Sequence, residues 1–366
     1  MVYVIYSFLF YFIGFLIVNQ NRSNRLVLFW LYLGIVVFWG ASYHYAVDTD
    51  GYIDYFYNEV RPFFRGMRFK WHGFEPGFNL LASICKTIYP HYVFFQLVLF
   101  GGEMLLIMSG FKKLLEEDEV LLCIPLLFFL FPSLLSAPRQ GVSIAFFIYA
   151  LPFINGKKSW RYFLFILVAT FFHRSSIVLV IVYLCKYVKR FLSSNWVLLS
   201  ILAIADIIWA SGFSFADSMD FLAQLLSADW LDMEDYAAHY LEDSMLESNY
   251  GIAKVLEINV VTICFALFCK GFNNDYLYRF ILIVYLVMGL VFGGLFAHRI
   301  MYYFQILYYV CLVIGILNAL KRVSASYSRQ LCYTVLSAYM IWFFLFHSGY
   351  AQKAYHLLPY ITYLYS

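Results

Sequence analysis

Four polar residues interrupt a long apolar stretch of this chain. The sequence TFFHRSSIV, residues 170–178, places His173, Arg174, Ser175 and Ser176 inside a stretch, 162–185, that is otherwise almost wholly apolar. An imidazole titrates near neutral pH, so His173 is a candidate general base or a group that orients a hydroxyl. A guanidinium stays charged at any depth and binds oxyanions in pairs of hydrogen bonds, which makes Arg174 a candidate anion-binding residue. The alternatives are a structural histidine and an ion pair between Arg174 and an outer carboxylate.

Three carboxylates in the first part of the chain could also take part in chemistry. Asp48 and Asp50 form a D-x-D pair, and Glu75 precedes Pro76. Two carboxylates can hold a hard cation, although aspartate also suits turns and helix caps. Glu75 is equally suited to be the N-cap of a short helix that begins with Pro76. Each of these residues therefore keeps both a catalytic and a structural interpretation.

Two further arginines stand at the starts of apolar segments. Arg139 follows Pro138 at the start of one segment, and Arg299 lies beside His298 at the junction of two others. A cation at a helix N-terminus opposes the helix dipole. Arg139 is therefore either functional or an ordinary interfacial cation whose side chain reaches water.

The composition predicts that these residues belong to a membrane protein. Of the 366 residues, 63% are hydrophobic and only 13% are charged, whereas about a quarter are charged in a soluble domain. The net charge of +3 is too small to indicate a nucleic-acid partner. The seven cysteines show no metal-binding or disulfide spacing. We predict a single integral membrane domain over residues 1–366.

Apolar runs give the expected membrane passes, since a crossing helix needs about 20 apolar residues. The predicted spans lie near 2–18, 26–43, 92–110, 120–137, 139–155, 196–212, 251–269, 279–297, 299–319 and 330–347. Glu103 and Asp206 fall within spans, where a charge is costly unless it is paired or hydrated. Basic clusters in short turns face the cytoplasm, so Arg22 and Arg25 place Met1 outside.

Basic clusters also decide how residues 162–185 are built. Lysines and arginines flank the stretch on both sides: Lys157, Lys158, Arg161, Lys186, Lys189 and Arg190. Both flanks are cytoplasmic only if the stretch enters the membrane and returns, as a broken helical hairpin near 160–188. Each arm of about 12 residues covers about 18 Å, less than the ~30 Å hydrocarbon core. We therefore expect the polar tip at the floor of an outward-facing cavity.

The completed prediction is an all-α polytopic protein with about 12 helical passes and both termini outside. Residues 44–76 form a first long outer loop that mixes carboxylates and cations. Residues 213–253 form a second, acidic outer loop with nine carboxylates and no lysine or arginine. We expect this loop to be a solvated face, with guidance of a charged polymer or calcium binding as alternatives.

The chain resembles the EpsG family, which is related to the Wzy-type polymerases of bacterial surface polysaccharides. The resemblance rests on DTDGYIDY (48–55), FEPGFNLL (74–81), PRQGVSIAFFIYAL (138–151), KKSWRYFLFILVATFFHRSSIVLV (157–180) and AHRIMYYF, which contains Arg299. Two positions depart from the family pattern. His44 and Tyr45 occupy a stretch where an arginine is frequent, and Arg174 stands where proline is frequent.

The resemblance implies a GT-C-like glycosyltransferase on the outer face of the bacterial plasma (inner) membrane. It would join undecaprenyl-diphosphate-linked oligosaccharides, donor and acceptor, with a flippase and a chain-length regulator as protein partners and with no cofactor or metal. Asp50 or His173 would activate the acceptor hydroxyl, with Glu75 as a further catalytic candidate. Arg139, Arg174 and Arg299 would hold the leaving diphosphate, because arginine binds phosphate oxygens in pairs.

Two other functions stay open from the sequence. A flippase for the lipid-linked glycan would also use broken helices and buried charge, although the chain shows no internal repeat and its polar features lie on one side. A single-sugar transferase with a polyprenyl-phosphate donor would need the same kinds of residue. Lengthening of glycans by detergent-solubilised protein would distinguish an enzyme from a flippase.

Overall fold

The structure, a computed structural model, describes residues 49–65, 74–123, 137–212, 252–269, 274–292 and 294–339, together with residues 12, 30, 34, 37, 42–43 and 361–362. These parts are almost wholly helical, which confirms the all-α prediction. Two short strands, β1 (Ser42–Tyr43) and β2 (Ile361–Thr362), pair antiparallel. The chain divides into a first unit, Met1–Tyr183 with Ser324–Ser366, and a second unit, Leu184–Val323.

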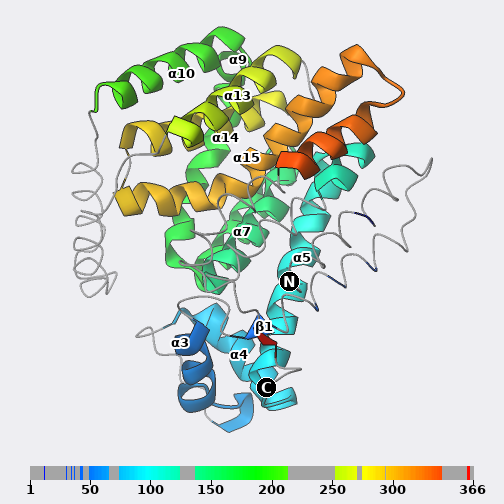
Figure 1. The fold of residues 1–366 in the computed structure, drawn as a ribbon. Helices are drawn as coiled ribbons and strands as arrows, with labels where there is room; N and C mark the ends of the chain where they lie inside the picture. The colour runs from blue at the N-terminus through cyan, green and yellow to red at the C-terminus, as the bar shows by residue number, and fades with distance from the viewer. Residues whose placement is uncertain are drawn as a thin grey trace. The chain divides into compact units, whose positions relative to one another are not determined.

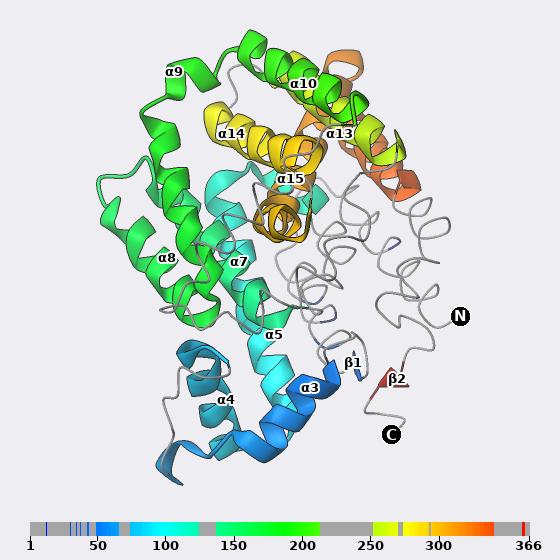
Figure 2. The same ribbon diagram turned by 90° about the vertical axis from the view of Figure 1, so that its left-hand side faces the viewer.

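The first unit is built around three neighbouring helices. α7 (Pro138–Ala150) lies between α5 (Tyr92–Leu114) and α8 (Trp160–Phe172), as Figure 2 shows. α4 (Pro76–Ile88) packs against α5 and α8. The shorter elements of this unit are α3 (Thr49–Asp54), the π-helix η1 (Tyr55–Glu59), and the 3₁₀ helices η2 (Phe63–Arg65) and η3 (Leu151–Phe153). The described part of the first outer loop is therefore mostly helical (Figure 1).

Local sequence explains where these helices begin and end. Pro76 and Pro138 occupy first-turn positions in α4 and α7, where proline's missing N–H costs no hydrogen bond. The Nδ1 atom of His91 accepts a hydrogen bond from the Val93 N–H and caps α5. Lys112 and Lys113 stand in the last turn of α5, where the helix dipole favours cations.

The chain folds back near residues 160–188, as predicted, while the cytoplasmic position of both flanks and the outward-facing cavity stay predictions. α8 ends at Phe172, and the chain returns as the 3₁₀ helix η4 (Arg174–Lys186). The Tyr162 hydroxyl donates to the Leu179 carbonyl, 2.6 Å away, and the Tyr162 and Tyr183 rings stack at 5.9 Å. The start of one arm therefore lies beside the other arm. With 13 residues, α8 is about 20 Å long, shorter than the ~30 Å hydrocarbon core.

A glycine lets α4 approach the end of α8. A Cβ at Gly77 would lie 2.8 Å from the Phe171 carbonyl oxygen and 3.0 Å from its carbon. Both atoms belong to the backbone, so the two helices would have to separate to accept a larger residue. This approach brings the N-terminus of α4 to the tip of the hairpin.

Replacing Gly77 with alanine should therefore destabilise the protein by about 1–3 kcal/mol, the usual cost of overpacking. Thermal unfolding in detergent measures the effect. Gly102→Ala in α5 is the matched control, because a Cβ there would meet nothing within 4 Å and alanine favours a helix interior. Equal unfolding temperatures for both variants would contradict the close approach.

The second unit is a packed group of helices. It contains α9 (Lys189–Leu192), α10 (Asn195–Ala210), α13 (Ile252–Phe268), α14 (Asp275–Leu286), the π-helix η5 (Val287–Phe292) and α15 (Gly294–Val323). α15 packs against both α13 and α14. The fully buried Arg279 guanidinium donates to the Asn195 side chain at 2.6 Å and lies 3.8 Å from Asp275. These contacts join α10 to α14.

A second, half-buried ionic group joins α13 to α14 and α15. The Lys254 ammonium donates to Glu257 at 2.7 Å and lies over the rings of Tyr285, Tyr308 and Tyr309. The Tyr308 hydroxyl also donates to Glu257, 3.2 Å away. Charges among apolar helices are costly unless they are paired, and this pairing ties three helices together.

Three described helices are long and apolar enough to cross a membrane: Tyr92–Leu114, Asp275–Phe292 and Arg299–Val323. They match predicted spans at 92–110, 279–297 and 299–319. The helices Pro138–Ala150, Asn195–Ala210 and Ile252–Phe268 overlap the predicted spans at 139–155, 196–212 and 251–269, and residues 328–339 are helical. Most residues of the spans at 2–18, 26–43 and 120–137 lie outside the described residues, as does the acidic loop except for its last two residues. The count of 12 passes stays a prediction.

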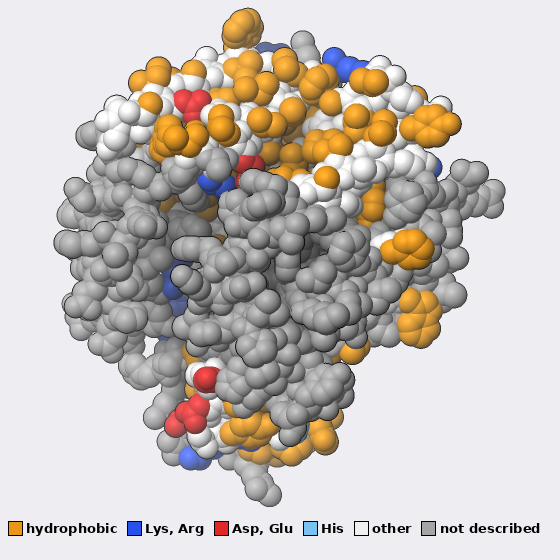
Figure 3. Space-filling model, in the orientation of Figure 1, with side chains coloured by type: hydrophobic (Ala, Val, Ile, Leu, Met, Phe, Trp, Pro, Cys, Tyr) orange, Lys and Arg blue, Asp and Glu red, His pale blue; other side chains and the backbone are white. Residues whose placement is uncertain are grey.

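Exposed apolar side chains fit a lipid environment. On α13 they recur at Ile252, Leu256, Val260, Ile263 and Leu267, which lie on one side of the helix. Hydrophobic side chains likewise cover much of the described upper surface in Figure 3. Among the charged residues within spans, Asp206 accepts a hydrogen bond from Asn259 at 3.2 Å. The Glu103 carboxyl oxygens are buried without a hydrogen bond in the described structure.

Candidate functional site

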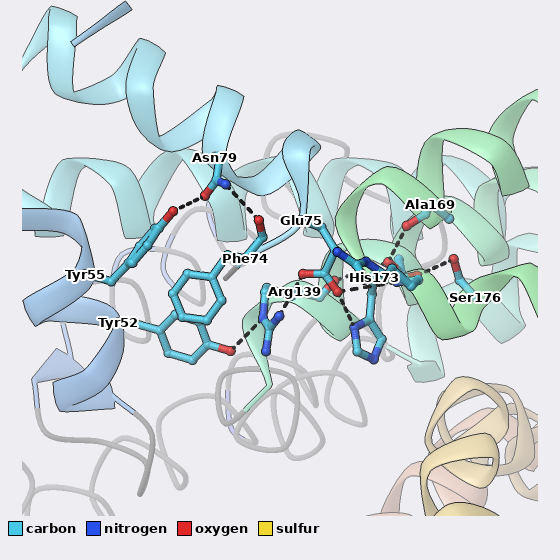
Figure 4. Close-up of polar contacts among 11 residues, drawn as sticks. Tyr52, Tyr55, Phe74, Glu75, Asn79, Arg139, Ala169, His173 and Ser176 are labelled. Carbon is cyan, nitrogen blue, oxygen red and sulfur yellow. Dashed lines mark hydrogen bonds and ion pairs between the residues drawn. The ribbon is translucent and has the colours of Figure 1, made fainter. Parts of the chain in front are cut away.

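Glu75 lies at the centre of a polar cluster at the hairpin tip (Figure 4). Its Oε2 atom accepts a hydrogen bond from Arg139 Nη1 at 2.7 Å, and its Oε1 atom lies 3.2 Å from His173 Nδ1. Glu75 does occupy the N-cap position of α4, as one interpretation of the sequence expected, but its side chain makes no capping bond. The carboxylate instead joins α7 to the end of α8. We call Glu75, Arg139, His173 and Tyr52 the Glu75 cluster.

Arg139 is held on several sides. Its Nε atom donates to the Tyr52 hydroxyl at 3.1 Å, and its guanidinium carbon lies 4.5 Å from the centre of the Phe74 ring. The Tyr52 and Phe74 rings stack at 5.0 Å. Only 14% of the Arg139 side chain is exposed. The structure therefore differs from the interpretation of Arg139 as an interfacial cation that reaches water.

His173 stands where the helix ends. Its backbone is extended, and its N–H donates to the Ala169 carbonyl at 2.9 Å, which closes the last turn of α8. The Ser176 hydroxyl donates back to the His173 carbonyl at 2.8 Å. The Ser143 hydroxyl of α7 donates to the Ala169 carbonyl at 2.8 Å. These hydrogen bonds satisfy backbone groups where the helix breaks, so the hairpin tip has a defined conformation.

The surroundings of Glu75 strongly favour its charged form. Burial alone would raise its pKa, but the hydrogen bond with His173, the positive charge of Arg139 and the hydrogen bond with Arg139 together lower the pKa to about 2. Glu75 therefore stays a carboxylate throughout the physiological range. A carboxylate with so low a pKa is a weak base, because base strength falls with pKa.

This shift predicts how stability depends on pH. The free carboxyl has a pKa of 4.5, so ionised Glu75 stabilises the fold fully above that pH, and the contribution is lost as the pH falls toward 2. Glu75→Gln should therefore lower the free energy of unfolding by about 3 kcal/mol at pH 7, and the difference from wild type should shrink below pH 4.5. Chemical unfolding in detergent from pH 7 to pH 3 measures both values. A difference that does not depend on pH would contradict the ion pairs.

The arrangement can orient an imidazole and present cations to an anion. A carboxylate that accepts from Nδ1 directs the other ring nitrogen, Nε2, toward whatever bears the proton to be removed. The guanidinium can bind phosphate oxygens through its planar fork. Among the described residues, no three histidine, cysteine, aspartate or glutamate side chains come together as a metal site.

The other predicted site residues have no side-chain contact with Glu75 among the contacts given above. Arg174 contributes its backbone N–H, 3.4 Å from Glu75 Oε1. Asp50 is exposed in the first turn of α3, two residues before Tyr52. Asp48 lies outside the described residues. Arg299 belongs to α15 in the second unit. The contacts above thus join Glu75, Arg139 and His173. The functional roles of all the predicted site residues stay predictions.

Reasoning from the sequence missed Tyr52, which belongs to the Glu75 cluster, and Phe74, whose ring packs on Tyr52 and Arg139. Both lie inside quoted motifs, DTDGYIDY and FEPGFNLL, but each could be an ordinary apolar packing residue. Tyr55, three residues after Tyr52, packs edge-on against Phe74 and donates to Asn79, which donates in turn to the Phe74 carbonyl at 2.7 Å. The i, i+3 spacing of the two tyrosines was the available signal, because it puts both on one face of a helix.

Comparison with known proteins gives one match. The model of the EpsG family matches residues 25–362, nearly the whole chain. No curated protein and no solved structure matches this sequence. The match includes every described residue of the Glu75 cluster.

Proposed function

This chain belongs to the EpsG family, and we propose that it is a membrane glycosyltransferase that polymerises surface polysaccharide. Its substrates would be repeat units linked to undecaprenyl diphosphate, joined on the outer face of the bacterial plasma membrane. The observation that supports this most is the buried carboxylate held between an arginine and a histidine at the tip of a broken hairpin. Charged groups at such a place in a membrane protein are typical of function.

In this proposal His173 is the general base. Its Nε2 atom takes the proton from the acceptor hydroxyl, whose oxygen forms the new bond to the anomeric carbon of the donor. The bond from that carbon to the diphosphate breaks, and the electron pair leaves with the diphosphate on its lipid. Glu75 orients the imidazole through Nδ1 and stabilises its protonated form. The low pKa of Glu75 makes it the weaker candidate base.

Arg139 binds the leaving diphosphate in this proposal. Glu75 and Tyr52 accept hydrogen bonds from its Nη1 and Nε atoms, and these bonds hold the guanidinium in one orientation. The fixed fork is preorganised for negative charge that grows as the bond breaks. Arg174 and Arg299 are further diphosphate-binding candidates, and Asp50 is the alternative base.

The test is polymerisation by the purified protein. Detergent-solubilised protein supplied with lipid-linked repeat units should produce a ladder of longer glycans on a gel. A flippase would leave the units unchanged, since no membrane separates two sides. A single-sugar transferase would also leave them unchanged, and would add one sugar only when a polyprenyl-phosphate donor is supplied as well. Either result would overturn the proposal.

Replacing Tyr52 with phenylalanine should lower kcat/KM by roughly tenfold, because a hydrogen bond to a charged group contributes about 1.5–3 kcal/mol. The loss acts through Arg139, so weaker substrate binding should appear as a raised KM. Tyr55→Phe is the matched control: it removes a hydroxyl bonded to Asn79 and leaves the Arg139 contacts in place. Steady-state kinetics of both variants decide the point, and equal losses would contradict a positioning role for Tyr52.

A further inference from the structure

An apolar patch covers the end of α4 that is remote from Glu75. Five large side chains form it, and we call them the α4 patch: Phe63, Phe64, Ile84, Ile88 and Tyr89. Phe64 is 84% exposed, Ile88 68% and Tyr89 56%. Hydrophobic side chains are visible at the lower end of Figure 3, where α3 and α4 lie in Figure 1. A soluble surface rarely gathers so many large apolar side chains, so such a patch indicates a partner.

Hydrogen bonds hold the patch in place. The Phe63 N–H donates to the Thr87 hydroxyl at 2.7 Å, and the Ser83 hydroxyl donates to the Arg61 carbonyl. The Lys86 ammonium donates to the carbonyls at the end of η1, at 2.7 Å to Phe56 and 2.8 Å to Val60. Residues 61–63 are therefore fastened along the last two turns of α4. The outward direction of the apolar side chains is a property of the fold.

The patch lies next to a membrane-crossing helix in the chain. Only residues 89–91 separate Ile88 from Tyr92, the first residue of the span Tyr92–Leu114. The four Cα–Cα steps from Ile88 to Tyr92 reach at most about 14 Å. The span has 23 residues and is about 34 Å long. Each of its ends therefore lies within a few ångströms of a surface of the ~30 Å hydrocarbon core. The headgroup layer on each side is about 5–8 Å thick, and the patch falls at its depth.

We propose that the α4 patch inserts into the interfacial layer of the lipid bilayer beside the N-terminal end of α5. Aromatic residues favour this layer, since they combine an apolar body with a polarisable or polar edge. The exposed charges nearby, Arg61 and Glu59, can stay in the headgroup region. The first outer loop is then partly a membrane-bound segment. Because α4 carries Glu75 at its other end, this anchoring fixes the height of the Glu75 cluster in the membrane.

Depth measurement by spin labelling tests this inference without any assay of activity. Phe64→Cys and Ile88→Cys, each in the full-length protein, are labelled with a nitroxide and reconstituted into vesicles of phosphatidylethanolamine and phosphatidylglycerol. Asp54→Cys is the matched control, an exposed polar position on α3. The seven native cysteines are all buried or half-buried, and the spectrum of the labelled parent protein corrects for them.

We expect oxygen to relax the labels at 64 and 88 several-fold more effectively than a water-soluble nickel chelate, relative to the label at 54. Equal accessibility ratios at all three positions would overturn the inference. Spin–spin broadening at 64 and 88 that disappears on dilution with unlabelled protein would assign the patch to a second copy of the chain, and would overturn it as well. Phe64 and Ile88 are surface residues, so both variants should fold.

Discussion

Replacing Arg139 with lysine should reduce polymer formation at least a hundredfold. Lysine keeps the positive charge but lacks the planar guanidinium group. A lysine at this position therefore cannot hydrogen-bond Glu75 and Tyr52 and also bind a diphosphate. Removing one preorganised group that stabilises developing charge costs about 10²–10³ in rate. The measurement is kcat/KM for purified protein with lipid-linked repeat units.

Arg161→Lys supplies the control for the Arg139 variant. Arg161 lies in the first turn of α8, with its guanidinium near the Phe153 and Trp160 rings, and takes no part in the Glu75 cluster. We expect its kcat/KM to stay within about twofold, as for most surface substitutions. If the Arg139 variant kept a third or more of the wild-type value, the diphosphate role of Arg139 would be wrong.

Replacing His173 with asparagine should lower kcat by about 10²–10⁴, the usual contribution of general base catalysis. Asparagine can still bond the Glu75 carboxylate, so the tip should keep its structure and substrate binding should change little. The pH–rate profile gives the sharper readout. Wild type should lose activity toward acid pH as the imidazole becomes protonated, and this limb should be missing from the residual activity of the variant.

The pH–rate profile of the His173 variant shows whether His173 acts as the general base or as a structural residue. A variant that is slower but keeps the wild-type acid limb would show that another group, with Asp50 as the first alternative, accepts the proton. Thermal unfolding of the same preparation serves as the control for folding. An unfolding temperature close to that of wild type ties the loss of rate to chemistry.

Residue types in the sequence were enough to predict the hairpin. Lysines and arginines on both sides of residues 162–185 allow only one arrangement that keeps all of them cytoplasmic, and the Tyr162 contacts confirm that the chain folds back. The 3₁₀ form of the returning arm was not predicted. Five of the six residues from Ile177 to Val182 are β-branched, which lowers α-helix propensity. The outcome also depends on packing against α8, which no local pattern encodes.

The members of the Glu75 cluster were predicted one at a time, but their contact was not. Glu75 is 64 residues from Arg139 and 98 from His173, and a single sequence contains no distance between such positions. The resemblance to GT-C enzymes favoured Asp50 as the base, because their first outer loop commonly supplies an acidic catalytic residue. The burial that makes Glu75 the central carboxylate comes from the approach of α4 to α8 at Gly77. That approach is a property of the folded chain alone.

Photolabelling of the diphosphate site tests the central claim most directly. A lipid-linked donor with a diazirine on the sugar next to the diphosphate would be irradiated with the purified protein, and the labelled peptides would be identified by mass spectrometry. We predict labels on peptides that contain Glu75, Arg139 or His173, and competition by unlabelled donor. Labels confined to other peptides, with these three unmodified, would contradict the assignment of the Glu75 cluster as the site of glycosyl transfer.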